Sequence, residues 1–231
     1  LRTPHMLGAN VTIPHKEAVI PWLDECDPQA ARIGAVNTII NLQGRLIGYN
    51  TDAPGFLQAL QERAGPTFEL RGKQAILLGN GGAARGAAVA LLDSQVETLT
   101  ILGRTEEAVA SFLAHLRQQT GASNLRGTQL GTLAARNFLI EADVLVNTTS
   151  VGLKPEDETQ LVPIEVLPVA TLVMDMIFNP PLTPLLRAAE ARGCPVLNGL
   201  SMLLYQGTLA FEIWTGQSAP VDVMRAALGL E

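Results

Sequence analysis

Cysteine, aromatic residues and charged residues are all scarce in this sequence of 231 residues. Two residues are cysteine, 4% are aromatic and 16% are charged, whereas 47% are hydrophobic. This apolar fraction excludes an intrinsically disordered chain. Cys26 and Cys194 lie far apart and have no histidine at metal-ligand spacing. We therefore expect free thiols in a reducing cytosol, and no metal site.

The sequence also lacks a basic cluster and a long apolar run. Asp and Glu number 22 against 16 Lys and Arg, which gives a net charge of −6. This balance argues against a nucleic-acid-binding surface. The longest apolar stretch is only a handful of residues, far below the roughly 20 of a membrane-spanning helix. We expect a cytoplasmic protein, a monomer or homodimer, with no membrane or nucleic-acid partner.

Two styles of patterning divide the chain. Residues 8–52 predict brief strands around a helix at about 16–24, with Gln43-Gly44 and Gly48 as the turns of a hairpin. From about residue 73, strands alternate with helices, which predicts right-handed crossovers and a parallel sheet. The expected strands are 74–78, 98–102, one within 124–130, 143–146, 172–177 and 195–197; the expected helices are 53–63, 83–92, 105–119, one opened by Thr183-Pro184 and closed by Gly193, and 200–215.

A glycine-rich turn carries the strongest local signal. Gly79, Gly81 and Ala84 fit the pattern G-x-G-x-x-A directly after a predicted strand and at the start of a predicted helix. The first glycine allows a tight turn, the second lets a diphosphate approach the backbone, and the helix N-terminus faces the anion. We interpret the turn as a dinucleotide site; the alternative is an ordinary glycine-rich turn.

The end of the next strand bears on which dinucleotide binds. An NAD site usually has Asp or Glu there, whereas this chain has Arg104 and Thr105 after Gly103. An arginine fork suits a 2′-phosphate, so NADP is favoured. Arg104 as a solvated loop residue is the alternative, and Glu106 and Glu107 leave room for NAD.

Other polar groups are candidates for chemistry. A predicted strand ends at the ligand-binding edge of the sheet with Asn147, Thr148, Thr149 and Ser150. Their hydroxyls and amide face ribose or nicotinamide, or simply form a hydrogen-bonded turn. A Lys16–Asp52 pair beside a carbonyl is able to transfer a proton, although most such residues are only solvated. Gln206 and Met202 share one face of the last predicted helix, and the Gln206 amide needs polar partners, supplied by a ligand or by backbone.

Seven motifs, taken together and in order, resemble the shikimate dehydrogenase family over nearly the whole chain. They are N-V-T-I-P-H-K at 10–16, G-A-V-N-T at 34–38, N-T-D-x-x-G at 50–55, G-N-G-G-A-A-R at 79–85, N-T-T-S-V-G at 147–152, T-P-L-L at 183–186 and G-L-S-M-L-L-Y-Q at 199–206. The resemblance implies reversible, NADP-dependent reduction of 3-dehydroshikimate to shikimate in aromatic amino acid biosynthesis.

The resemblance also implies an α/β fold and a set of roles. A Rossmann-like doubly wound parallel sheet domain at 72–198 would bind NADP, and a smaller discontinuous α/β substrate domain would comprise 1–54 and the C-terminal helices at 199–231, joined by a linker helix at 55–71. Lys16 and Asp52 are the implied catalytic pair, and Thr12, Asn37, Asp52 and Gln206 the implied substrate contacts. The implied NADP contacts are Gly79, Asn80, Gly81, Gly82, Ala83, Arg104, Thr105, Thr148, Ser150, Ile177, Gly199 and Met202.

Three departures from the family pattern suggest rival functions. The family's opening segment, whose Ser-x-Ser pair grips the substrate carboxylate, is expected before Leu1 and does not occur in this sequence. Phe178 stands where the family often has a substrate-binding Tyr, and Gly103 replaces a common Asn. The rivals are an NAD-using quinate/shikimate dehydrogenase and a non-catalytic NADP-binding relic. The intact set of Lys16, Asn37, Asp52 and Gln206 argues against the relic, and the N-T-D-x-x-G match disfavours a related folate-cycle dehydrogenase.

Overall fold

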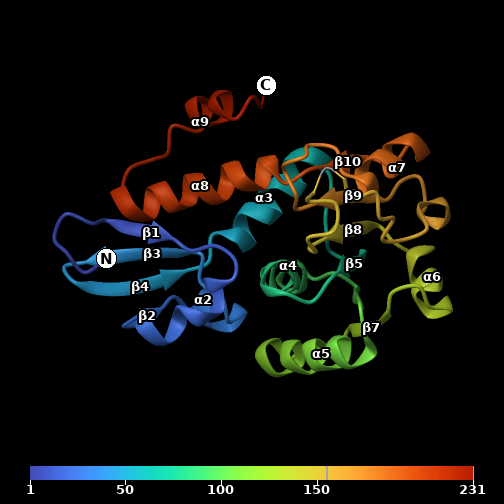
Figure 1. Ribbon diagram of the computed structural model, residues 1–231, viewed down its shortest axis with the longest axis horizontal. Coiled ribbons are helices and arrows are strands. Elements are labelled where there is room, and N and C mark those ends of the chain that lie inside the picture. Colours follow the sequence, from blue (N-terminus) through green and yellow to red (C-terminus); the bar gives the residue numbers. More distant parts are fainter. Residues whose placement is uncertain (155, 231) are drawn as a thin grey trace.

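Two β-sheets with their own helices organise the computed structural model, which describes residues 1–154 and 156–230. Figure 1 shows a small sheet at one end, a larger sheet at the other, and helices α3 (Asp52–Ala64) and α8 (Leu200–Thr215) running between them. This architecture agrees with the predicted fold class, an α/β protein with a doubly wound parallel sheet and a smaller second unit.

The larger sheet has six parallel strands in the order β10-β9-β8-β5-β6-β7. Chain order therefore reverses between β5 and β8, which creates the switch point where doubly wound sheets bind ligands. The strands are β5 (Gln74–Leu78), β6 (Thr98–Gly103), β7 (Leu125–Gln129), β8 (Val144–Asn147), β9 (Leu172–Asp175) and β10 (Val196–Leu197).

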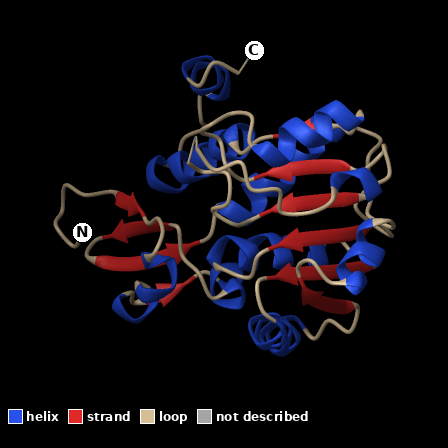
Figure 2. Cartoon of the chain, turned by 45° about the vertical axis from the view of Figure 1, so that its right-hand side comes forward, coloured by secondary structure: helices blue, strands red, loops and turns tan. Residues whose placement is uncertain are grey.

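Helices cover both faces of this sheet (Figure 2). Residues of β5 alternate between the two layers: Ala75 and Leu77 join one core cluster, and Ile76 and Leu78 join the other. A strand that is buried on both faces needs apolar residues at every position, which accounts for the continuous apolar run Ala75–Leu78. The first layer includes α3, α4 (Gly82–Asp93), α5 (Glu106–Thr120) and part of α8; the second includes α6 (Leu133–Leu139), the 3₁₀ turn η2 (Ile164–Val166) and α7 (Pro184–Arg192).

The smaller sheet is mixed, with the order β1-β3-β4-β2. Its strands are β1 (Gly8–Asn10), β2 (Glu25–Cys26), β3 (Thr38–Leu42) and β4 (Arg45–Tyr49), and its helical pieces are α1 (His15–Ala18), the 3₁₀ turn η1 (Ile20–Trp22) and α2 (Pro28–Ile33). The indole of Trp214 on α8 donates to the carbonyl of Ile39 at 2.9 Å, which anchors the C-terminal part of the chain to this sheet.

Close packing of α3 on α8 brings residues 52–64 against the C-terminal part of the chain. A Cβ at Gly55 would lie 2.7 Å from the backbone nitrogen of Gln206, so only glycine permits this approach. After α8, helix α9 (Val221–Ala227) is held by Arg225, which pairs with Glu62 at 2.6 Å and donates to the Tyr205 hydroxyl at 2.9 Å. The division of the chain into domains at residues 54, 71 and 198 stays a prediction. Helix α3 begins at Asp52 and runs across the first of these boundaries.

Several predicted details are wrong. The helix expected at 16–24 is two short pieces, α1 and η1, because Pro21 lacks the N–H that a continuous helix needs. Gly48 lies inside β4 rather than in a turn, where a Cβ would be 2.5 Å from Leu23. The strand expected at 172–177 ends at Asp175. Helices α2 and α6 were not predicted, although Asp27-Pro28 is a clear helix start.

Within residues 1–154 and 156–230, no helix combines the length and the hydrophobicity needed to cross a membrane.

Candidate active site

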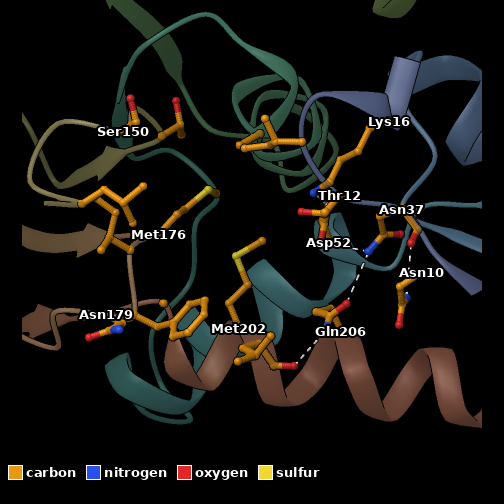
Figure 3. A pocket seen from close by; sticks show the side chains of 18 of the residues that line it. Asn10, Thr12, Lys16, Asn37, Asp52, Ser150, Met176, Asn179, Met202 and Gln206 are labelled. Carbon is orange, nitrogen blue, oxygen red and sulfur yellow. Dashed lines mark hydrogen bonds and ion pairs between the residues drawn. The ribbon is translucent and has the colours of Figure 1, made fainter. Parts of the chain in front are cut away.

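A cavity of about 620 Å³ lies between the two sheets and receives side chains from both. The small-sheet side supplies Thr12, Lys16, Asn37 and Asp52, and α8 supplies Met202 and Gln206. Ala83, Thr148, Ser150, Ile177 and Gly199 line it from the larger sheet. Figure 3 shows Lys16, Asn37, Asp52 and Gln206 gathered at one side, with Ser150 and Met176 at the other and Met202 between them. Predicted site residues from distant parts of the chain thus share one cavity.

Lys16 and Asp52 form an ion pair at the edge of this cavity. Lys16 Nζ lies 2.7 Å from Asp52 Oδ2, and the two side chains are 18% and 16% exposed. Lys16 comes from α1, while Asp52 is the first residue of α3, where its negative charge also suits the helix dipole. An ammonium has three donors, so this pairing leaves others free for a ligand oxygen.

Asn37 organises this side of the cavity. Its Oδ1 accepts from the Thr51 backbone nitrogen at 2.7 Å, and its Nδ2 donates to Thr51 Oγ1 and to Asp52 Oδ1, both at 2.9 Å. A longer contact of 3.4 Å reaches Gln206 Oε1. Because Asn37 is 2% exposed and its amide is engaged by these partners, its visible role is to orient Asp52 and Gln206.

Gln206 and Met202 share the cavity-facing side of α8, as their spacing predicts. Gln206 Nε2 donates to the carbonyl of Leu203 at 2.9 Å, so backbone supplies part of the hydrogen bonding of this half-buried amide. Its Oε1 faces Asn37. The Gln206 amide therefore lies on the same side of the cavity as Lys16 and Asp52 (Figure 3).

The glycine turn after β5 has the geometry of an anion cradle. Gly79 has φ +104°, and a Cβ there would lie 2.9 Å from Thr148 Oγ1, so this position requires glycine. A Cβ at Gly81 would meet no atom within 4 Å, and one at Gly82 would meet only Glu17 Oε1 at 3.7 Å. The backbone from Gly81 into α4 is therefore open to a diphosphate at a helix N-terminus, with Asn80 in the same turn and Ala83 reaching the main cavity.

The end of β6 is open to solvent, as expected for a 2′-phosphate site. Arg104 and Thr105 are exposed, and Thr105 Oγ1 caps α5 by accepting from the Ala108 nitrogen at 3.3 Å. Glu106 accepts from the hydroxyl of Thr128 at 2.7 Å and from the Gln129 nitrogen at 2.9 Å, and these bonds lower the pKa of its carboxyl. Glu106 is thus engaged with β7.

Gly103 is explained by packing: a Cβ at this position would lie 2.5 Å from Val109 Cγ2. A larger residue would push α5 away from the strand, so this departure from the family pattern follows from the valine that faces it.

The carboxyl edge of β8 and β9 forms part of the cavity wall. Thr148 and Ser150 line the cavity, and Thr148 Oγ1 also donates to the Leu78 carbonyl at 2.7 Å. Of the two roles considered for the Asn147 side chain, a ligand contact and a hydrogen-bonded turn, the structure shows the second: its Oδ1 accepts from the Thr149 nitrogen at 2.9 Å, and its fully buried amide donates to Asp175 at 3.0 Å. Gly199 is required by its packing, since a Cβ there would lie 2.1 Å from the Met176 carbonyl oxygen.

Some cavity residues were missed. Asn10, Met176 and Asn179 all line the cavity, and no role was predicted for them although Asn10 lies in a quoted motif. Asn10 donates to the Asn37 carbonyl at 3.2 Å and to Thr38 Oγ1 at 3.1 Å. Phe178, noted for its missing hydroxyl, is also at the cavity wall and is 46% exposed.

His115 joins a small polar cluster with Arg85 and Glu17. Its Nε2 lies 3.1 Å from Arg85 Nη1, while Arg85 Nη2 pairs with Glu17 at 3.2 Å. Partial burial, followed by the Arg85 charge, lowers the pKa of the His115 imidazole. This cluster ties α5 and α4 to α1. Among the residues that the structure describes, no group of three or more His, Cys, Asp or Glu side chains is placed to hold a metal ion.

These features define a dinucleotide-binding α/β protein with a second, smaller sheet attached. They are the strand order of the larger sheet, the glycine turn at its switch point and the polar cavity between the two sheets. Comparison with known proteins agrees. Family models match at residues 1–39 (shikimate dehydrogenase substrate binding domain), 60–154 (shikimate/quinate 5-dehydrogenase) and 199–228 (shikimate 5′-dehydrogenase C-terminal domain).

Relatives match over almost the whole chain. The shikimate dehydrogenase (NADP(+)) of Desulforamulus reducens is 47% identical, and the match covers 97% of this chain and 76% of the relative. Shikimate 5-dehydrogenase from Thermus thermophilus, solved with NADP(H) and shikimate, has a TM-score of 0.83 at 38% identity, with coverage of 98% and 79%. Quinate dehydrogenase from Corynebacterium glutamicum, solved with NAD, has a TM-score of 0.86 at 30% identity, with coverage of 96% and 77%.

The chain belongs to the shikimate dehydrogenase family. The family resemblance and the fold class predicted from the sequence are confirmed.

Proposed function

We propose that this protein catalyses the reversible, NADP-dependent reduction of 3-dehydroshikimate to shikimate. The observation that carries the proposal is the Lys16–Asp52 pair, 2.7 Å apart, in a cavity that also reaches the switch point of a dinucleotide-binding sheet. A proton donor and a hydride site are what reduction of a ring carbonyl requires. The curated relatives named for this activity support the substrate and the cofactor.

Binding of the dinucleotide is assigned to the larger sheet. The open backbone of Gly81 and Gly82 at the N-terminus of α4 fits a diphosphate, and Arg104 and Thr105 fit a 2′-phosphate. The walls formed by Thr148, Ser150, Ile177, Gly199 and Met202 would hold the nicotinamide end. When bound, NADPH supplies the hydride.

Proton transfer is assigned to the opposite wall. Lys16 donates a proton to the oxygen of the carbonyl as negative charge develops there, and Asp52 holds the ammonium in place. In the reverse direction Lys16 accepts the proton from the shikimate hydroxyl. The low exposure of both side chains limits competition from water and strengthens their attraction.

Substrate orientation is assigned to the polar groups around this pair. Thr12 and Gln206 face the cavity, and Asn37 contributes by fixing Asp52 and Gln206. Aligning the reacting carbon in this way accounts for a large part of the expected rate enhancement.

The second candidate is an NAD-using quinate/shikimate dehydrogenase. The quinate dehydrogenase solved with NAD supports it, as do Gly103 and the adjacent acidic residues of α5. A non-catalytic relic is disfavoured, because the Lys16, Asn37, Asp52 and Gln206 set is both present and mutually bonded. The cytoplasm is the proposed location, in keeping with the free thiols of Cys26 and Cys194. The oligomeric state, a monomer or a homodimer, stays a prediction.

Product analysis tests the proposal. Shikimate deuterated at the carbon that becomes the ketone of 3-dehydroshikimate is incubated with NADP, and both products are identified by mass spectrometry. The proposal expects 3-dehydroshikimate without the label and NADPH carrying one deuterium. Unlabelled NADPH, or no conversion by a protein that binds NADP, contradicts it.

A further inference from the structure

A buried carboxylate stands behind the cavity wall. Asp175 ends β9 and has no exposed surface. Its Oδ2 accepts from Asn147 Nδ2 at 3.0 Å and from Thr183 Oγ1 at 2.7 Å, and its Oδ1 accepts from the Ile177 nitrogen at 3.0 Å. Within residues 1–154 and 156–230, no Lys, Arg or His forms an ion pair with it. A buried acid held only by neutral donors is costly, so a specific task is expected.

Asp175 fixes two loops that form the same wall. Directly, it holds the backbone of Ile177, which lines the cavity. Indirectly, it sets the orientation of the Asn147 amide, whose Oδ1 then accepts from both the nitrogen (2.9 Å) and the hydroxyl (2.7 Å) of Thr149. Thr149, which lines the cavity next to Thr148 and Ser150, is therefore held in the wall through Asn147.

We propose that Asp175 is a positioning residue for the nicotinamide end of the cofactor: it acts through Asn147 and Ile177 to fix the wall against which that end binds. This rests on the proposed dinucleotide function. The carboxylate is required because it accepts on both oxygens. An asparagine at position 175 would turn its NH₂ group toward either the Ile177 nitrogen or the Asn147 amide, placing a donor against a donor.

The other end of the dinucleotide lies outside this network. The glycine turn and Arg104 share no hydrogen bond with Asp175, so adenosine 2′,5′-bisphosphate, which lacks the nicotinamide half, reports on the rest of the site. Calorimetric titration of this fragment and of NADP separates a local positioning role from general damage to the fold.

The test compares Asp175→Asn with the unchanged protein. We expect the Kd for NADP to rise about tenfold and the Kd for the bisphosphate to stay within about twofold. The matched control is Thr171→Val, at the opposite end of β9. It removes a buried hydroxyl that donates to the Ala142 carbonyl at 2.6 Å, and both affinities should be retained.

A second pair of variants covers the case in which Asp175→Asn does not fold. Thr183→Val removes one donor to Asp175 from outside the cavity wall and should weaken NADP binding alone, whereas Thr183→Ser keeps the hydroxyl and should restore it. Unchanged NADP affinity in Asp175→Asn or Thr183→Val, or equal loss for both ligands, overturns the positioning role. If the unchanged protein binds neither ligand, the dinucleotide function itself fails instead.

Discussion

Asp52 is held by two residues from different elements: Lys16 Nζ lies 2.7 Å from its Oδ2, and Asn37 Nδ2 lies 2.9 Å from its Oδ1. The carboxylate is thus fixed on both oxygens, and the Lys16 ammonium takes its direction from it. This relationship joins α1, the residue before β3 and α3 into one unit of proton-transfer machinery, although the residues are up to 36 positions apart.

Removing the ammonium should affect the chemical step above all. In Lys16→Ala we expect kcat to fall about 100- to 10,000-fold, with a much smaller rise in the KM for shikimate, because the proton is transferred in the transition state. Steady-state kinetics measures both. Lys73→Ala is the control, since Lys73 pairs with Asp143 at 3.1 Å near the start of β5, at the opposite end of the strands. An unchanged kcat in Lys16→Ala would exclude the catalytic role.

Arg104 should separate the two cofactors. Its exposed guanidinium is the group proposed to bind the 2′-phosphate, and a charge-assisted bond of this kind contributes about 1.5–3 kcal/mol. Arg104→Gln should therefore raise the KM for NADP about 10- to 100-fold and leave that for NAD nearly unchanged. Arg187→Gln, which breaks a surface pair with Glu158, is the control. Equal effects of Arg104→Gln on the two cofactors would show that another group binds the phosphate.

Two glycines of the same turn should behave differently. Gly79→Ala places a Cβ at φ +104° and 2.9 Å from two threonine side chains, so we expect about 2 kcal/mol of lost stability by urea denaturation. Gly81→Ala meets open space, so stability should change by less than about 1 kcal/mol while NADP binding weakens. If Gly81→Ala binds NADP normally, the diphosphate does not approach the backbone there.

The imidazole of His115 should make stability depend on pH. Its pKa is lowered in the folded protein from the ordinary 6.5, so below that value the unfolded chain binds the proton more readily. Folding stability is then complete above about pH 6.5 and falls as the pH drops through this window. The neighbours Arg85 and Glu17 oppose each other in this effect, with Arg85 lowering the pKa and Glu17 raising it.

Urea denaturation at about pH 7.5 and about pH 5.5 checks this prediction. His115→Gln should lose less stability between the two values than the unchanged protein. Identical losses in His115→Gln and the unchanged protein would show that His115 titrates normally.

The larger sheet could be predicted from sequence because each of its signals is local. The run Gln74–Leu78, the glycine turn after it and the Thr105 cap of α5 all depend on near neighbours in the chain, and all lie where expected. The boundaries of α8 also agree, because Gly199 and Gly216 flank it. Pro21 was a local signal as well, but the helix predicted at about 16–24 ran through it.

The site was predicted only in part, because its internal bonds are long-range. The family motifs placed Lys16, Asn37 and Asp52 together, but nothing local shows that the Asn37 amide is engaged by Thr51 and Asp52. The Asn147 amide was a candidate ligand contact because it ends a strand at the ligand-binding edge of the sheet. Its true partner, Asp175, is 28 residues away and ends another strand. His115 and Arg85 likewise meet only when α5 packs beside α4.

The central claim is that this cleft oxidises and reduces shikimate with NADP. Initial rates measured by nicotinamide absorbance, with shikimate or quinate and with NADP or NAD, test it most directly. The account predicts that shikimate with NADP gives the highest kcat/KM of the four combinations. A preference for quinate with NAD, or no turnover in any combination by a protein that binds NADP, would contradict it.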